Sequence, residues 1–294
     1  MSLEITTAFV EQYRGNVEHL AQQKGSRLRS SVSVETVTGK NAFFEQIGST
    51  SARVRASRHS DTPRMDTPHA RRRVSLVDYD WADLIDREDQ VRMLIDPTSP
   101  YAEAASNAMG RAMDDVIIAA ADATAYTGVD GSTSTAFDTS GMVVDVQVGI
   151  SPAADTGLNV GKLRAAKEKL DANEVDDMDR YIILNAKQMN NLLAETEITS
   201  SDFNTVKALV QGEVDTFMGF NFIRSERIGV DSNSDHKVLF YAKSGIKLGI
   251  GAEPAARISE RDDKNYATQV FYSMAIGATR MEEKKVGFIE CDPS

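Results

Sequence analysis

One stretch constrains the fold of this chain more than any other, Ser99 to Gly128, SPYAEAASNAMGRAMDDVIIAAADATAYTG. Small and apolar residues recur in it at three- and four-residue spacing, which predicts a single long helix. Ser99 can cap its N-terminus, Pro100 suits the first helical position, and Gly128 is placed to end it. About 28 residues at about 1.5 Å each make a rod of roughly 42 Å. Its many alanines allow other backbone to approach closely, and its charged residues exclude a membrane span.

Composition limits the size of the core and the chemistry that is available. With 294 residues, 41% of them apolar, the chain can form one large or two modest domains. Cys291 is the only cysteine, so neither a disulfide framework nor a cysteine zinc site can form, which fits a reducing cytoplasm. The first 30 residues lack the apolar core of a signal peptide, and no apolar run is long enough to cross a bilayer.

The charge is distributed unevenly along the chain. The net charge is −11, yet residues 1–74 hold 12 basic and 7 acidic residues, a net +5, which leaves −16 for the remainder. This asymmetry indicates that the basic part docks on an acidic part, either of the same chain or of another copy. Nucleic-acid binding is the competing explanation for the basic part, although an overall pI near 4.9 argues against it for the whole chain.

Residues 41–80 predict a long two-stranded ribbon. Phe43, Phe44 and Ile47 begin one strand, and Val74 and the residues around Trp81 form the returning one. The tip, HSDTPRMDTPHA, has two Thr-Pro steps and is therefore extended and non-helical. A hairpin of this kind is marginal alone, so we expect it to lie on another surface; a flexible loop is the alternative.

The remaining segments read as an arm and a compact α/β region. Residues 1–30 carry a weak helical stripe typical of an arm that needs a partner surface. From Leu158 the pattern predicts a helix to about Asn173, a buried strand Tyr181–Leu184 and a second helix capped by Asn185. Residues 142–148 predict one strand, MGFNFIRSERI and HKVLFYA predict two more, and the C-terminal segment predicts a ribbon around the turn DDKN.

No arrangement of residues predicts an active site, a cofactor site or a metal site. His59 and His69 lie in the proline-rich tip without metal-ligand spacing. The stretch Gly157–Leu163 is one residue short of a phosphate loop and is better explained as a helix start. An acidic cluster is better explained as a solvated turn than as a calcium loop, and comprises Glu174, Asp176, Asp177 and Asp179.

Three segments in this order resemble the major capsid protein of tailed bacteriophages, with the Hong Kong 97-type fold: YAEAASNAMGRAMDDVIIAA, FMGFNFIRSERI and NYATQVFYSMAIGATRMEEKKV. The resemblance covers nearly the whole chain. It implies an α+β fold with an N-terminal arm at 1–40, an extended loop at 41–80, a peripheral domain at 81–157 with a spine helix at 100–127, an axial domain at 158–257, and C-terminal strands at 258–294 that complete the peripheral domain.

The resemblance also implies a function without catalysis. Pentamers and hexamers of the chain would tile an icosahedral head around double-stranded DNA, assembled in the host bacterial cytoplasm. A separate scaffolding protein, a portal and a decoration protein are the implied partners, and no membrane or cofactor is involved. The alternatives are the shell of a cellular nanocompartment with the same fold, a nucleic-acid-binding module and, last, an enzyme.

We expect the extended loop to act without covalent bonds. No lysine occurs between Lys40 and Lys162, so the loop lacks the nucleophile with which some family members cross-link their subunits. The loop arginines lack interleaved aromatic residues for base stacking, whereas arginine pairs well with carboxylates. The hypothesis is therefore that seven arginines anchor the loop on the acidic surface of an adjacent subunit: Arg53, Arg55, Arg58, Arg64, Arg71, Arg72 and Arg73.

Overall fold

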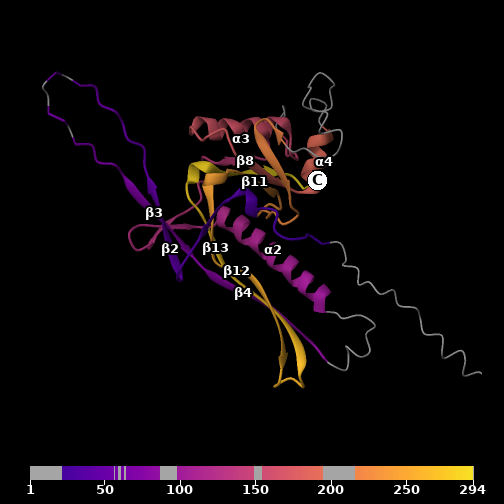
Figure 1. The fold of residues 1–294 in the computed structure, drawn as a ribbon. Coiled ribbons are helices and arrows are strands. Elements are labelled where there is room, and N and C mark those ends of the chain that lie inside the picture. Colours follow the sequence, from indigo (N-terminus) through magenta and orange to yellow (C-terminus); the bar gives the residue numbers. More distant parts are fainter. Residues whose placement is uncertain are drawn as a thin grey trace, which may run out of the picture. The chain divides into compact units, whose positions relative to one another are not determined.

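A computed structural model describes residues 22–55, 57–58, 61–62, 64–86, 98–148, 154–194 and 216–293 (Figure 1). Helices and several sheets alternate in these ranges, which confirms the predicted α+β class. The chain divides into two compact units. The first consists of Met1–Ser26, Asp78–Arg111 and Ala252–Ala275, and the second of Arg27–Val77, Ala112–Gly251 and Ile276–Ser294. The helix predicted near the N-terminus falls largely outside the described residues.

The long helix is present as α2, Thr98–Asp122. Its buried face carries Ala105, Met109, Met113 and Ile117, one residue every four positions, whereas Ala108, Ala112 and Val116 are only half-buried. The helix ends earlier than the prediction of residue 127, because Ala125–Thr127 forms strand β5 instead. Gly128 lies beyond that strand, with a φ of 97°, in the turn that leads to β6 (Thr133–Thr135). None of the described helices is long and apolar enough to cross a membrane.

Small residues on α2 let the backbone before β1 run against it. The amide of Gly25 donates to Asn107 Oδ1 at 3.1 Å. Gly110 is essential for this approach, because a Cβ there would lie 2.6 Å from the amide nitrogen of Ser26. One turn further on, the carboxylate of the fully buried Asp114 accepts the amides of residues 27 and 28, both at 3.1 Å.

A six-stranded sheet contains several strands that are buried along most of their length. Its order is β7 (Val143–Val144), β14 (Val286–Cys291), β11 (His236–Ala242), β8 (Arg180–Leu184), β10 (Phe220–Arg224) and β9 (Thr216–Phe217). The predicted strand at 142–148 is thus only two residues long. Helix α3 (Val160–Ala172) contacts β14 and β7. Helix α4 (Ala186–Ala194) follows β8, and Asn185 caps it by accepting the amide of Gln188 at 2.8 Å, as predicted.

Two four-stranded sheets complete the described fold. One has the order β1 (Ser33–Thr36), β12 (Ile246–Arg261), β13 (Ala267–Arg280) and β4 (Val77–Ile85). The other has the order β2 (Asn41–Ile47), β3 (His69–Ser75), β5 and β6. Short 3-10 turns occur at Arg29–Ser31, Lys243–Gly245 and Glu283–Lys285.

The ribbon predicted at 41–80 is present as the antiparallel pair β2–β3, in register from Asn41 opposite Ser75 to Ile47 opposite His69. The prediction of its returning strand is wrong in part, because the residues around Trp81 form β4 of the other four-stranded sheet. Its root is packed tightly in the second unit. Val37, Phe44, Val74 and Met281 form a buried cluster there. Gly277 of β13 has no room for a side chain, since a Cβ would collide with the carbonyl oxygen of Ser75. The ribbon is therefore packed at its root, whereas its described residues beyond Phe44 and Gln46 are exposed up to Arg71.

Candidate functional site: the arginine-rich ribbon

The outer part of the ribbon is exposed on every side. Every described residue from Ile47 to Arg71 is exposed, including Ile47 at 70%, Val54 at 89% and Met65 at 49%. Extended backbone with apolar and basic side chains in water is marginally stable by itself. A second surface that covers this segment would therefore stabilise it, which makes the segment a candidate assembly surface.

The four predicted site residues in the loop itself are all exposed: Arg53, Arg55, Arg58 and Arg64. Arg55 donates to the carbonyl oxygens of Ser57 and Arg58, and among the described residues it makes no ion pair with a carboxylate. Arg64 lies 3.2 Å from Asp66, with both side chains about nine-tenths exposed. An ion pair this exposed is worth about 0–1 kcal/mol and is easily exchanged for another partner.

The three arginines of β3 have different roles, because successive side chains of a strand point to opposite faces. Arg71 is half-exposed and pairs with Glu45 of β2 at 2.9 Å. Arg73 lies over the ring of Tyr126, 4.6 Å from its centroid. Arg72 has a side chain only 7% exposed. The structure corrects the expectation for Arg72, since it turns inward and binds residues of its own chain.

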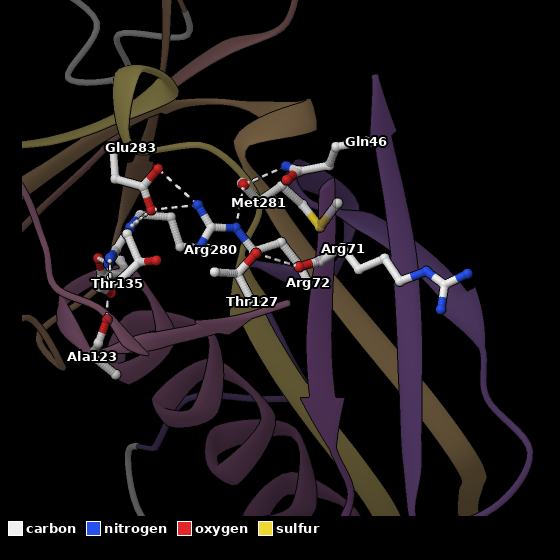
Figure 2. A network of polar contacts seen from close by, with 10 residues as sticks. Gln46, Arg71, Arg72, Ala123, Thr127, Thr135, Arg280, Met281 and Glu283 are labelled. Carbon is white, nitrogen blue, oxygen red and sulfur yellow. Dashed lines mark hydrogen bonds and ion pairs between the residues drawn. The ribbon is translucent and has the colours of Figure 1, made fainter. Parts of the chain in front are cut away.

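Arg72 and Arg280 converge on the single carboxylate of Glu283 (Figure 2). Arg72 Nη2 donates to both carboxylate oxygens at 2.6 and 2.7 Å, and its Nε donates to the carbonyl oxygen of Met281 at 2.9 Å. Gln46 of β2 donates to the same carbonyl. Arg280 Nε lies 3.7 Å from Glu283. Figure 2 shows that Arg71 points its guanidinium away from this cluster.

Arg280 also ends helix α2. Its Nη1 donates to the carbonyl oxygens of Ala121 at 2.7 Å and Ala123 at 2.9 Å. The last carbonyls of a helix have no partner within the helix and carry a partial negative charge. A buried guanidinium gives them hydrogen-bond donors and a compensating positive charge. This contact explains why α2 ends at Asp122 and the chain then turns into β5.

The cluster has less negative than positive charge. Glu283 is 24% exposed and faces two guanidiniums that are almost fully buried. Burial lowers the pKa of Arg280; the Glu283 carboxylate opposes this shift, and the neighbouring positive charge of Arg72 adds to it. Glu283 is thus the shared counter-ion that ties the root of the ribbon to the end of α2.

A shallow hollow of about 500 Å³ lies beside this root. Glu45, His69 and Arg71 of the ribbon line it together with Thr127 and Val129. Val129 is 85% exposed at its rim. Polar and apolar groups that face open space there extend the candidate surface from the loop to the ribbon root.

Sequence reasoning missed Arg280 and Glu283. The two residues lie more than 200 positions from Arg72, so no local spacing links them to it. The signal that was available is the strand MAIGATR, in which an arginine ends an otherwise small and apolar run. Such an arginine predicts a buried, paired guanidinium.

The nucleophilic groups near the C-terminal strand are held in unreactive states. Cys291 is fully buried, and burial raises the pKa of its thiol to about 12. Burial likewise lowers the pKa of Lys162, whose Nζ donates to the carbonyl oxygens of Thr156 at 2.6 Å and Glu290 at 2.9 Å. A protonated, enclosed thiol is a poor nucleophile, so this pair belongs to the core.

The other stretches weighed for chemistry have local structural roles. The interpretation of Gly157–Leu163 as a helix start is confirmed: α3 begins at Val160, and Asn159 caps it by accepting the amide of Lys162 at 2.8 Å. In the acidic turn before β8, Asp177 pairs with the buried Arg180 at 2.9 Å. No group of three or more metal-ligating side chains occurs within the described ranges.

Comparison with known proteins extends over nearly the whole chain. Residues 5–293 match the family described as Phage capsid protein. The chain shares 20% identity with the capsid of cyanophage P-SCSP1u at a TM-score of 0.74, covering 99% of this chain and 95% of that chain. The head of Helicobacter pylori bacteriophage KHP40 gives 10% identity and a TM-score of 0.75, with 99% and 98% covered. The capsid of Ralstonia phage GP4 gives 9% identity and a TM-score of 0.74, with 97% of this chain and 96% of that chain covered. No curated protein matches the chain. The predicted resemblance and fold are therefore confirmed.

Proposed function

The chain belongs to the phage capsid protein family, and from that premise we propose that it is the major capsid protein that assembles as pentamers and hexamers into an icosahedral head around double-stranded DNA. A member of this family is a structural protein of the virion and not an enzyme. The observation that carries the proposal is the family match across residues 5–293, because it includes every element described above. We place assembly in the host bacterial cytoplasm, with a scaffolding protein, a portal and a decoration protein as partners.

The proposed mechanism of stabilisation is non-covalent and repeated. Four exposed loop arginines, Arg53, Arg55, Arg58 and Arg64, lie on acidic surface of an adjacent copy, with the half-exposed Arg71 at the ribbon root. Each exposed pair adds only about 0–1 kcal/mol. Because every subunit repeats the contact in a closed shell, the weak terms act together. Arg72 is excluded from this set, since its guanidinium is bound to Glu283.

The same proposal assigns domain roles. Residues 158–257 make up the axial domain around the local symmetry axes, and α2 with the C-terminal strands makes up the peripheral domain. The root cluster at Glu283 supports this division, because it holds the ribbon in one orientation relative to the end of α2. A fixed orientation is what a neighbour-binding ribbon needs if all copies are to make the same contact.

The experiment is to purify particles and measure their stability in rising salt. A variant that combines Arg53→Gln, Arg55→Gln, Arg58→Gln and Arg64→Gln is expected to dissociate at lower salt or temperature than the unaltered particle. Arg164→Gln with Lys167→Gln, which removes two cations from α3, is the control. Equal stability of the loop variant and the unaltered particle would reject the anchoring role.

The contents of the particles distinguish the shell types. A phage head yields nuclease-protected double-stranded DNA after assembly with its partners, whereas a cellular nanocompartment of the same fold encloses an enzyme. The family match favours the phage head.

A further inference from the structure

Strand β4 presents an acidic edge. It is the last strand in the order β1-β12-β13-β4, so one of its sides is the edge of that sheet. Side chains alternate along a strand, and here the face with even numbers is exposed at Asp78, Asp80 and Leu84. The opposite face turns inward, with Trp81 half-buried and Ile85 buried. The exposed face is therefore ordered by the packing of its other side.

The described residues of this strand concentrate negative charge. Residues 77–86 contain four aspartates, Asp78, Asp80, Asp83 and Asp86, and no basic residue. Within the part of the chain that the structure describes, no ion pair involves any of the four. Like charges this close on one strand repel each other, so a cationic partner along the edge would relieve the repulsion.

The ribbon loop carries the matching pattern. Arg53 and Arg55 are two residues apart in an exposed segment, with Val54 89% exposed between them. In extended chain this spacing is about 6.6–6.8 Å, the same as between Asp78 and Asp80. Side chains on one face of a strand recur every two residues, whether the paired strands run parallel or antiparallel. Both arginines can therefore face both aspartates at once.

We propose that the loop of one copy lies along β4 of a second copy, with Arg53 and Arg55 opposite Asp78 and Asp80. This inference rests on the proposed function and names the acceptor of the loop arginines. A second copy fits better than nucleic acid because the acceptor is itself anionic. Bidentate arginine–carboxylate pairs then fix the register of the loop on β4. The uneven distribution of charge along the chain is explained by this contact between copies.

Site-specific cross-linking tests the contact directly. The full chain carrying Arg55→Cys and Asp80→Cys is treated with a bismaleimide whose spacer spans an arginine–carboxylate pair. Cys291 is fully buried, so it gives little background. A ladder of covalently linked copies on a denaturing gel is expected. The control carries Arg55→Cys and Asp262→Cys, which moves the acceptor cysteine to an exposed acidic position near the end of β12, and should remain at monomer size.

Charge exchange gives a second test. Arg53→Asp with Arg55→Asp should weaken particles, as should Asp78→Arg with Asp80→Arg, and the four changes together should restore them. Glu260 and Asp262 are an acidic pair with the same sequence spacing. Combining the loop changes with Glu260→Arg and Asp262→Arg should therefore not restore the particles. A far-ultraviolet circular dichroism spectrum confirms that each variant is folded.

The outcomes separate this contact from the proposed function. Particles from the unaltered chain, with the cysteine variant still at monomer size and no rescue by charge exchange, would overturn the β4 contact alone. In that case the four aspartates only protect a sheet edge from self-association, or the loop binds nucleic acid, which a salt-sensitive gel shift would reveal. If the unaltered chain forms no particles, the proposed function is rejected, and the proposed contact, which rests on it, is rejected as well.

Discussion

Replacing Glu283 with Gln tests whether one carboxylate holds the root of the ribbon. The change keeps the size of the side chain and removes the charge that Arg72 and Arg280 share. Removing one partner of a buried ion pair costs about 3–5 kcal/mol. Because Glu283 is 24% exposed, we expect the lower end of that range, about 3 kcal/mol. The assay is equilibrium urea denaturation of the unassembled chain.

The matched control is the ion pair of Arg71, the residue before Arg72 in β3, with Glu45 of β2. Glu45 accepts from Arg71 at 2.9 Å, but the side chains are 66% and 45% exposed. Glu45→Gln should therefore cost only about 0–1 kcal/mol. In a double-mutant cycle with Arg72→Met, the Glu283 and Arg72 changes should show a coupling of about 0.5–3 kcal/mol. If Glu283→Gln is no more destabilising than Glu45→Gln, the shared counter-ion explanation is wrong.

Three further predictions follow from the same contacts. Gly110→Ala, which in an exposed helix would stabilise by about 1 kcal/mol, should instead lower the free energy of unfolding, because its Cβ would lie 2.6 Å from the backbone of Ser26; thermal denaturation gives the sign. Arg280→Lys should lower the melting temperature, since one ammonium cannot serve the carbonyls of both Ala121 and Ala123 together with Glu283. Cys291, with its thiol pKa raised to about 12 by burial, should resist iodoacetamide at pH 8 in the folded chain and react in denaturant; rapid labelling of the folded chain would contradict this.

Local patterns predicted the elements whose signals lie within a few residues. The long helical run of α2, the capped start of α4 at Asn185 and the first ribbon strand β2 are all of this kind. In each case the side chains that determine the element are neighbours in sequence. This is why their positions could be predicted without any knowledge of the tertiary fold.

The errors arise where distant residues decide the outcome. The run ADATAYTG continues the helical pattern of α2, but Arg280 binds the carbonyls of Ala121 and Ala123 and the next residues pair with β3. Arg72 was grouped with its neighbours on charge alone, whereas the alternation of β3 turns it toward Glu283, more than 200 residues away. Tertiary contacts override local propensity at both places.

The sequence likewise predicts one part of the candidate surface, the loop arginines, and not the other part, their acceptor. The exposed loop arginines follow from composition, since a proline-rich polar tip cannot bury them. Their acceptor could not be predicted, because the acidic face of β4 becomes visible only once β4 is known to end a sheet and to turn Ile85 inward. Sheet order is a property of the whole fold.

The most direct test of the central claim is electron microscopy of material from cells that produce the full chain together with its assembly partners. We predict closed shells built from pentamers and hexamers, which return only monomer-size chains when denatured in detergent because the loop has no lysine for a cross-link. Individual chains that never associate, with any partner and at any salt concentration, would contradict it.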